Sequence, residues 1–435
     1  MAEPSSINIP VVFSTQTQYP LPSQKFMIPS TWRRYQLSQL INKALSLVSP
    51  IPFDFLISGD LLRTSIHDWC SEHGIAEEET LNIEYIQSVL PPQKTSELPH
   101  DDWVSAVSSK FPGFFLTASY DGYLRAFDYS QQTVIEQLVH QGPITSLCVI
   151  PVESQEAATR LIATSSLDLT CRISKVGLTN NEHSFDPQAS LHLHTAPVSS
   201  ISCNASGTQL LTSSWDSLIG LFDTTIPDVD EIDLEQEEGT TRKKRRKLGS
   251  EPTRGKRKAP ISVLKSHTAR VSKAVFGGEN SAVSCGFDST VRAWDLDHGV
   301  CTNTITSSDK AFLDLVCPSG NSAITASMDR SINLFDFRSS STIASALSLK
   351  QVSTPSCLAV SPVYGQAEQQ VVSGGYDGAA RIWDLRSTKL PVATFFGWED
   401  AGDKKILGVD WTKDVIALGG ERGMAIWRVS GGESQ

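Results

Sequence analysis

The sequence lacks any apolar run of about 18 residues, the length that a helix needs to cross a bilayer. Its amino terminus, MAEPSSINIP, lacks the basic stretch and apolar core of a secretory signal, so we expect the chain to stay in a reducing compartment. The eight cysteines include no CxxC pair and no Cys/His cluster with zinc-ligand spacing. We therefore expect no membrane segment and no structural metal, and we interpret the cysteines as buried free thiols.

Catalytic motifs are also missing. The 435 residues contain no P-loop, no metal-ligand spacing and no nucleophile elbow, so the sequence favours a protein that is not an enzyme and has no cofactor of its own. With 40% hydrophobic and 20% charged residues, the composition is that of a soluble globular protein. This length predicts two or more domains, unless a repeat architecture merges them.

The net charge of -11 conceals a local inversion. Residues 228–238 hold seven acidic and no basic side chains, whereas residues 242–258 hold ten basic side chains and one acidic. The remainder of the chain is acidic, and an acidic globular surface repels phosphate backbones. Any contact with nucleic acid is therefore expected at the basic segment alone.

One pattern recurs seven times from about residue 114 onward: an apolar run, small residues, an acid in a turn, an alternating run and usually an aromatic residue. Two of the copies read SAVSCGFDSTVRAWD and QVVSGGYDGAARIWD. The intervals between successive turn acids are 47, 48, 72, 41, 48 and 44 residues, and the acids are Asp121, Asp168, Asp216, Asp288, Asp329, Asp377 and Glu421.

Each copy predicts two antiparallel strands joined by a tight turn. A WD-repeat β-propeller consists of units of four strands and about 40 to 45 residues that bury one another's faces. Residues 101–432 resemble this family. RAWD at 292–295 and RIWD at 381–384 match the ending typical of that family. We predict seven blades. The last copy ends close to the carboxyl terminus, so residues 93–100 are expected to supply the outer strand of its blade.

The fourth copy contains a candidate side-chain network. His267, Ser284, Asp288 and Trp294 have the spacing at which propellers of this kind link a loop histidine, a strand serine, the turn aspartate and an indole. A catalytic triad is the competing interpretation, but it would need an exposed nucleophile beside an oxyanion hole. The second and third copies have Ile173 and Phe222 where tryptophan would stand, so we expect incomplete networks there.

The interval of 72 residues contains an insert, 224–260, with almost no large apolar residue. Such a segment is predicted to be a disordered loop in the third blade. Two basic clusters within it suggest a bipartite nuclear import signal. A solvated charge run and a nonspecific RNA tether are the alternatives. The basic residues are Arg242, Lys243, Lys244, Arg245, Arg246, Lys247, Arg254, Lys256, Arg257 and Lys258.

Residues 7–86 have periodicities of their own. Alternating apolar residues predict strands around 7–13, 26–28, 53–57 and 81–85, and the apolar spacing over 37–48 predicts a helix. Residues 64–74 indicate a short helix that ends at Gly74. This order is that of a ubiquitin-like β-grasp. We expect a mainly β protein with this small α+β domain at 1–90, a linker and closing strand at 91–100, and the propeller at 101–435.

The combination resembles a family of nuclear WD-repeat ribosome-biogenesis factors that act with Pescadillo and the Block-of-proliferation protein, and whose amino-terminal domain is similar to that of Notchless. The residues that carry the resemblance are PFDFLISGDLLRTSIHDW at 52–69, LNIEYI at 81–86 and HDDWVSAV at 100–107. The resemblance implies that the propeller pairs with the propeller of the Block-of-proliferation protein. It also implies that the ubiquitin-like domain docks on the metal-dependent adhesion site of Midasin, an AAA ATPase that strips the complex from the precursor of the large ribosomal subunit.

The same resemblance gives a role to the acidic triplet Glu77, Glu78 and Glu79. By comparison with the loop of that family, Glu78 is the residue that completes the shell of a magnesium ion held by the partner, with Glu77 and Glu79 as electrostatic flanks. Three adjacent glutamates leave the assignment among neighbours open, and a solvated turn is the alternative.

The leading interpretation is thus a non-enzymatic adaptor in large-subunit assembly and pre-rRNA processing, located in the nucleus, nucleolus and nucleoplasm. A ubiquitin-pathway receptor is the second candidate, and it predicts an apolar binding patch on the grasp sheet. Direct RNA contact through the basic insert is a further expectation.

Overall fold

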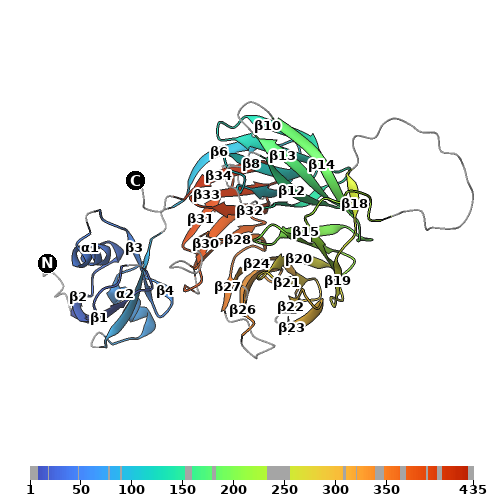
Figure 1. Ribbon diagram of the computed structural model, residues 1–435. Coiled ribbons are helices and arrows are strands. Elements are labelled where there is room, and N and C mark those ends of the chain that lie inside the picture. Colours follow the sequence, from blue (N-terminus) through green and yellow to red (C-terminus); the bar gives the residue numbers. More distant parts are fainter. Residues whose placement is uncertain are drawn as a thin grey trace, which may run out of the picture.

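The computed structural model describes residues 8–17, 19–47, 49–76, 79–88, 91–151, 159–178, 183–232, 255–306, 310–319, 321–338, 347–362, 369–387, 390–398 and 404–429. Within them the chain forms a five-stranded sheet with two helices, followed by a ring of seven further sheets (Figure 1). The protein is mainly β with a mixed α+β unit at its amino end, as the sequence predicts. Neither described helix is long and apolar enough to span a membrane.

The amino-terminal unit is a β-grasp domain. Its sheet order is β2-β1-β5-β3-β4, with β1 and β5 parallel and the other neighbours antiparallel. The sequence pattern did not reveal β4, because two residues are too few to show alternation. The elements are β1 (Asn8–Ser14), β2 (Lys25–Pro29), α1 (Arg34–Leu45), β3 (Phe53–Ile57), β4 (Asp60–Leu61), α2 (Ile66–His73) and β5 (Leu81–Gln87).

Strand alternation and helix capping explain this domain. Ile9, Val11 and Phe13 on one side of β1 are buried, and Leu37 and Ile41 of α1 join the same core. Helix α2 begins where the Ser65 hydroxyl accepts a hydrogen bond from the Asp68 amide, and it ends at Gly74 with φ 65°. These are the start and stop signals that the sequence contains.

The seven sheets of the ring are numbered here as blades one to seven in chain order. The strands of the first three blades are β7 (Val104–Ser108), β8 (Phe114–Ser119), β9 (Tyr123–Asp128) and β10 (Thr133–Leu138); β11 (Ile144–Val149), β12 (Thr159–Ser166), β13 (Cys171–Leu178) and β14 (His183–Leu191); and β15 (Val198–Cys203), β16 (Gln209–Ser214), β17 (Leu218–Asp223) and β19 (Ser262–Lys265).

The strands of the last four blades are β20 (Val271–Phe276), β21 (Ser281–Gly286), β22 (Thr290–Asp295) and β23 (Val300–Thr306); β24 (Phe312–Ser319), β25 (Ser322–Ser327), β26 (Ser331–Asp336) and β27 (Leu347–Lys350); β28 (Pro355–Val360), β29 (Gln370–Gly375), β30 (Ala379–Asp384) and β31 (Ala393–Phe396); and β32 (Ile406–Thr412), β33 (Val415–Gly420) and β34 (Gly423–Arg428) with β6 (Gln93–Pro99).

Strand β6 closes the ring. It precedes the first blade in the chain, yet it pairs antiparallel with β34 from Gln93 opposite Arg428 to Pro99 opposite Gly423. Leu98 of β6 is buried with Met424 and Ile426 of β34. Blade seven therefore takes its fourth strand from the linker region, at the place where the strand count puts it.

The basic end of the insert is ordered, which corrects the prediction that all of 224–260 lacks structure. Residues Lys256–Lys258 form β18, which pairs parallel with β14 and adds a fifth strand to blade two. Composition alone could not reveal this strand, because its partner is the edge of another blade. Residues 233–254 lie outside the part of the chain that the structure describes.

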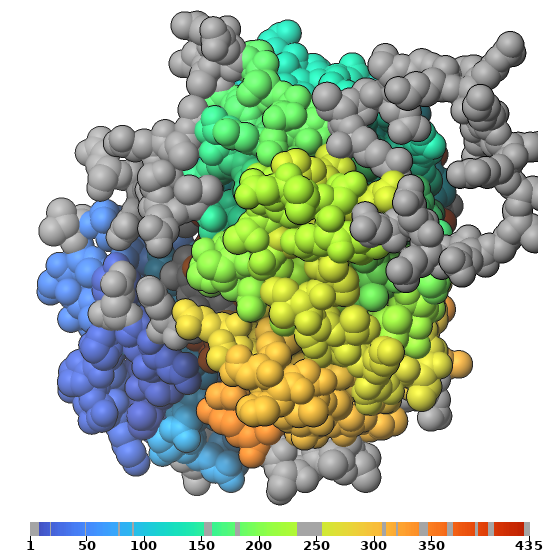
Figure 2. Space-filling view, turned by 45° about the vertical axis from the view of Figure 1, so that its right-hand side comes forward, coloured from blue at the N-terminus to red at the C-terminus, as the bar shows by residue number. Residues whose placement is uncertain are grey.

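The two domains touch at blade six. The Arg63 guanidinium donates a hydrogen bond of 2.8 Å to the Pro391 carbonyl, and Arg386 lies 3.9 Å from the Glu84 carboxylate. The outward-facing Leu56 of β3 and Ile86 of β5 are each only 2% exposed, although they lie on the face opposite the domain core. Figure 2 shows the amino-terminal domain, in blue, beside the propeller.

The cysteines are free thiols. Cys70, Cys171, Cys285 and Cys357 are buried, and the other four are half-buried. Burial raises the pKa of the Cys357 thiol to about 12 and that of Cys203 to about 11. In Cys357 and Cys203 the reactive thiolate is therefore scarce at neutral pH.

Candidate functional site

The predicted network in blade four is assembled in the structure. Nδ1 of His267 lies 2.8 Å from Oδ2 of Asp288, and its Nε2 lies 2.7 Å from Oγ of Ser284. The Trp294 indole donates to the same Ser284 oxygen at 2.8 Å. Burial opposes the charge on Asp288, but hydrogen bonds from His267 and Thr290 hold the pKa of this carboxyl below its usual value. The four side chains attach the loop that precedes β20 to the strands β21 and β22.

Other blades keep parts of this network. His140 of blade two bonds Asp168 and Thr164, and His194 of blade three bonds Asp216 and Thr212. In both cases a threonine hydroxyl takes the serine's place, and no indole joins it. In blade six the Trp383 indole donates to Ser373, whose hydroxyl donates in turn to the Gln351 amide oxygen.

The geometry of these networks is structural and not catalytic. Ser284 and Ser373 are completely buried, so neither hydroxyl can reach a substrate. Among the described residues, no group of three or more His, Cys, Asp or Glu side chains could hold a metal ion. Buried hydrogen-bond networks of this kind hold neighbouring strands in one arrangement.

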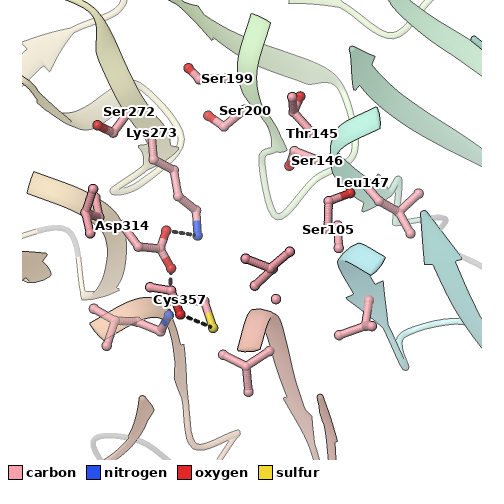
Figure 3. A pocket seen from close by; sticks show the side chains of 18 residues that line it. Ser105, Thr145, Ser146, Leu147, Ser199, Ser200, Ser272, Lys273, Asp314 and Cys357 are labelled. Atoms are coloured by element: carbon pink, nitrogen blue, oxygen red, sulfur yellow. Dashed lines mark hydrogen bonds and ion pairs between the residues drawn. The ribbon is translucent and has the colours of Figure 1, made fainter. Parts of the chain in front are cut away.

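The central channel is lined by the innermost strands and is polar (Figure 3). The Asp314 carboxylate of blade five forms an ion pair with the Lys273 ammonium of blade four at 2.6 Å. It also accepts a hydrogen bond from the Leu358 amide of blade six at 2.6 Å, so one carboxylate joins three blades. A series of hydroxyls donates to the carbonyl of the next blade, as Ser105 does to Ile144 at 2.6 Å. The sequence pattern missed Asp314 and Lys273, because nothing local marks residues that meet across blades.

The acidic triplet follows α2 and precedes β5. Glu77 and Glu78 lie outside the described residues, and the described Glu79 is exposed. The loop begins with the Ile75 amide bonded to the Cys70 carbonyl. Strand β5 runs from this end of the domain toward the linker for seven residues, or about 20 Å, so Glu79 stands near the end of β5 opposite the propeller connection.

The predicted import residues fall into two groups. Arg242, Lys243, Lys244, Arg245, Arg246, Lys247 and Arg254 lie outside the described residues, whereas Lys256, Arg257 and Lys258 form β18.

Asp223 at the end of β17 and the acidic start of the insert hold this basic end in place. Lys258 is 2% exposed and ion-paired to Asp223. The Asp230 carboxylate accepts the Arg257 amide at 2.8 Å, and the Asp228 carbonyl accepts Lys256 at 2.6 Å. The second basic cluster is thus not a freely accessible extended peptide over its last three residues.

A β-grasp domain followed by a seven-bladed ring defines the class: a WD-repeat propeller protein with a separate small amino-terminal domain. Comparison with protein-family models agrees. Residues 9–70 match the NLE (NUC135) domain, and residues 185–223, 258–295 and 351–384 match the WD domain, G-beta repeat.

Known relatives give the family. The chain is 55% identical over 443 residues to the ribosome biogenesis protein YTM1 of Laccaria bicolor, an alignment that covers 99% of this chain and 96% of that protein. The YTM1 protein of Coprinopsis cinerea is 54% identical over 98% of this chain and 96% of its own length, and that of Coccidioides immitis is 33% identical over 89% and 86%. The chain therefore belongs to the YTM1 family of ribosome biogenesis proteins, a non-catalytic family.

Proposed function

We propose that this protein is an adaptor in large ribosomal subunit assembly and pre-rRNA processing. In this proposal the propeller binds the propeller of the Block-of-proliferation protein, within a complex that includes Pescadillo. The amino-terminal domain offers a carboxylate to a magnesium ion held by the adhesion site of Midasin, and the ATPase then pulls the complex from the pre-ribosome. The observation that carries the proposal is membership of the YTM1 family over nearly the whole chain.

The position of the triplet supports the docking step. A carboxylate is the ligand that a partner-held magnesium ion with an open coordination position prefers. The loop leaves a capped helix at Gly74 and enters the core strand β5, and both flanks are hydrogen-bonded. Fixed flanks lower the entropy lost on binding. Glu79, the described member of the triplet, stands at the end of β5 away from the linker, which leaves room for a large partner.

The second candidate, a ubiquitin-pathway receptor, lacks support. It needs an exposed apolar patch on the grasp sheet, but Leu56 and Ile86, the apolar residues on the outer side of β3 and β5, are buried. Arg386 of blade six lies beside Glu84 on the same side. On the outer side of β2 Met27 is 63% exposed, but one exposed apolar side chain does not make a patch.

Replacing Glu78 tests the docking step. We expect Glu78→Ala to weaken binding of the full chain to the isolated adhesion-site domain of Midasin by on the order of 100-fold, because a ligand of the magnesium ion is lost. Glu78→Asp should also weaken it, because the shorter side chain does not reach. Isothermal titration calorimetry in the presence of Mg²⁺ measures both.

Neighbouring acids provide the controls for this titration. Glu77→Ala and Glu79→Ala should cost only a few-fold, as electrostatic flanks do. Glu72→Ala, an exposed glutamate on α2, should have no effect. Unchanged affinity of Glu78→Ala would refute the assignment, and a large loss at Glu77 or Glu79 instead would move the ligand to that residue.

We further propose nuclear, nucleolar and nucleoplasmic location, with import directed by residues 242–247. Changing these six basic residues to alanine should abolish nuclear accumulation of a fluorescent fusion. Lys258→Met should leave import intact, because this side chain is buried and already ion-paired. If the basic residues instead tether RNA, the six-residue variant will remain nuclear and lose crosslinks to pre-rRNA. Loss of import in Lys258→Met alone would contradict the structural role of β18.

A further inference from the structure

Strand β18 is enclosed on both sides by other parts of the chain. On one side it pairs parallel with β14, as Figure 1 shows, and the Lys258 carbonyl accepts the His192 amide at 3.2 Å just beyond that strand. On the other side it faces residues 228–231, where the Arg257 carbonyl accepts the Glu231 amide at 2.9 Å. The backbone groups of this basic strand are thus engaged along both of its edges.

Residues 228–231, which we call the acidic segment, hold the strand through their carboxylates. Asp230 accepts the Arg257 amide at 2.8 Å, and Glu231 accepts the Ala259 amide at 2.9 Å. Hydrogen bonds to an ionised acceptor are about twice as strong as those between neutral groups. The acidic segment therefore competes, within one molecule, with any external acidic surface for the same strand.

The cationic side chains of β18 are engaged as well. The Lys258 ammonium pairs with Asp223, and this side chain is 2% exposed. The Lys256 ammonium donates to the Asp228 carbonyl at 2.6 Å. A receptor for basic clusters reads such side chains on an extended, accessible peptide. The docked strand cannot serve as that peptide, because its ammonium groups and its backbone groups already have partners.

Gly255 permits the close approach of β18 to blade two. A Cβ atom at this position would lie 2.9 Å from the Ala189 nitrogen and 3.0 Å from the carbonyl carbon of Gln188. Both are backbone atoms of β14, which cannot move aside as the end of a flexible side chain can. A side chain at position 255 should therefore detach β18 and leave every basic residue of the strand in place.

We propose that blade two and the acidic segment mask residues 256–258 from a protein receptor for basic peptides, and that detachment of β18 adds this second basic cluster to the import signal. The inference rests on the proposed import function of the insert and states which part of the signal is accessible. A protein receptor is favoured over RNA, because the strand is held through backbone amides as a protein groove holds a peptide, whereas phosphates are neutralised chiefly by Lys and Arg side chains.

Hydrogen–deuterium exchange of the full chain tests the mask without a receptor. In the unaltered chain we expect protection of the fragments that contain the Arg257 and Ala259 amides. Gly255→Val should raise their exchange rate at least about tenfold. Asp230→Ala should raise it too, whereas Asp230→Asn keeps an acceptor and should retain more protection. Asp186→Ala, which removes an exposed acid of β14, should change nothing.

Titration with purified importin α, a receptor that reads basic clusters, measures the consequence. Gly255→Val should bind at least about tenfold more tightly than the unaltered chain, because apparent affinity rises with the fraction of chains whose strand is accessible. Adding Lys256→Ala and Arg257→Ala to Gly255→Val should remove this gain. Arg257→Ala in the unaltered chain should change the affinity by less than about twofold, since a masked strand is not read.

The two measurements separate the mask from the import function itself. If Gly255→Val raises exchange but leaves the receptor affinity unchanged, the mask is overturned, whereas loss of binding on changing residues 242–247 would still support import. Unchanged exchange in Gly255→Val, or a large loss of receptor affinity in Arg257→Ala alone, would also overturn the mask. If importin α binds none of these proteins, both proposals fail. A uridine dodecamer that gains affinity in Gly255→Val while importin α does not would overturn the mask in favour of RNA.

Discussion

Removing residues 1–100 is expected to leave an aggregated or unfolded ring, whereas removing residues 1–91 leaves a folded propeller. The two truncations differ mainly by β6, which supplies the fourth strand of blade seven. Without it β34 presents an unpaired edge, and the buried cluster of Leu98, Met424 and Ile426 is opened to water. Size-exclusion chromatography and thermal unfolding of both proteins measure the difference.

A point variant in the full chain tests the contribution of β6 without removing the amino-terminal domain. Leu98→Asp places a charge in the buried cluster and should lower the unfolding temperature strongly. Thr95→Asp, an exposed position on the same strand, should be nearly neutral. A monomeric protein that starts at residue 101 and unfolds at the temperature of the longer one would contradict the closure.

The closing strand also bears on the proposed extraction. The linker from the amino-terminal domain runs directly into β6, so a load on that domain acts on the strand that completes the ring. The contacts of Arg63 with Pro391 and of Glu84 with Arg386 lie on blade six, beside this path. Through these contacts a load on the amino-terminal domain can reach the propeller before the pairing of β6 with β34 is broken.

Local patterns were sufficient for most of the fold. A turn acid followed by a residue with positive φ recurs in the blades, with Gly122 and Gly378 where glycine was expected, and with Ser217 and Ser289 at φ 66° and 60° elsewhere. The turn aspartate accepts a hydrogen bond from the backbone amide two residues later. In blade one the Tyr123 amide donates to Asp121 at 2.9 Å. The acid is therefore needed whether glycine or serine stands next to it.

Contacts between distant segments could not be read in the same way. The insert looked disordered because composition does not show that Asp223 and Asp230 hold Lys258 and Arg257 against blade two. Trp215 and Tyr376 directly precede turn acids in the repeats, but the approach of Arg270 to Trp215 and of Lys405 to Tyr376 depends on the ring geometry. The acidic triplet was found by resemblance, since three adjacent carboxylates alone fit a solvated turn equally well.

Replacing Asp314 is expected to destabilise the propeller by about 3 to 5 kcal/mol, the cost of breaking a buried ion pair on one side. Its carboxylate accepts Lys273 at 2.6 Å and the Leu358 amide at 2.6 Å, and it is 6% exposed. In Asp314→Ala the Leu358 amide loses its acceptor and the Lys273 ammonium loses its counter-charge. Urea unfolding of the full chain at pH 7, followed by tryptophan fluorescence, measures the loss.

Three further variants show whether the loss comes from the unpaired partners. Asp314→Asn keeps an acceptor for the Leu358 amide and should cost less than alanine. The double variant Asp314→Leu with Lys273→Met removes both charges and should recover part of the stability, because an apolar pair needs no compensation. Asp336→Ala breaks an ion pair with the exposed Arg338 and should cost under about 1 kcal/mol. If Asp314→Ala were as mild as Asp336→Ala, the carboxylate would not be what joins blades four, five and six.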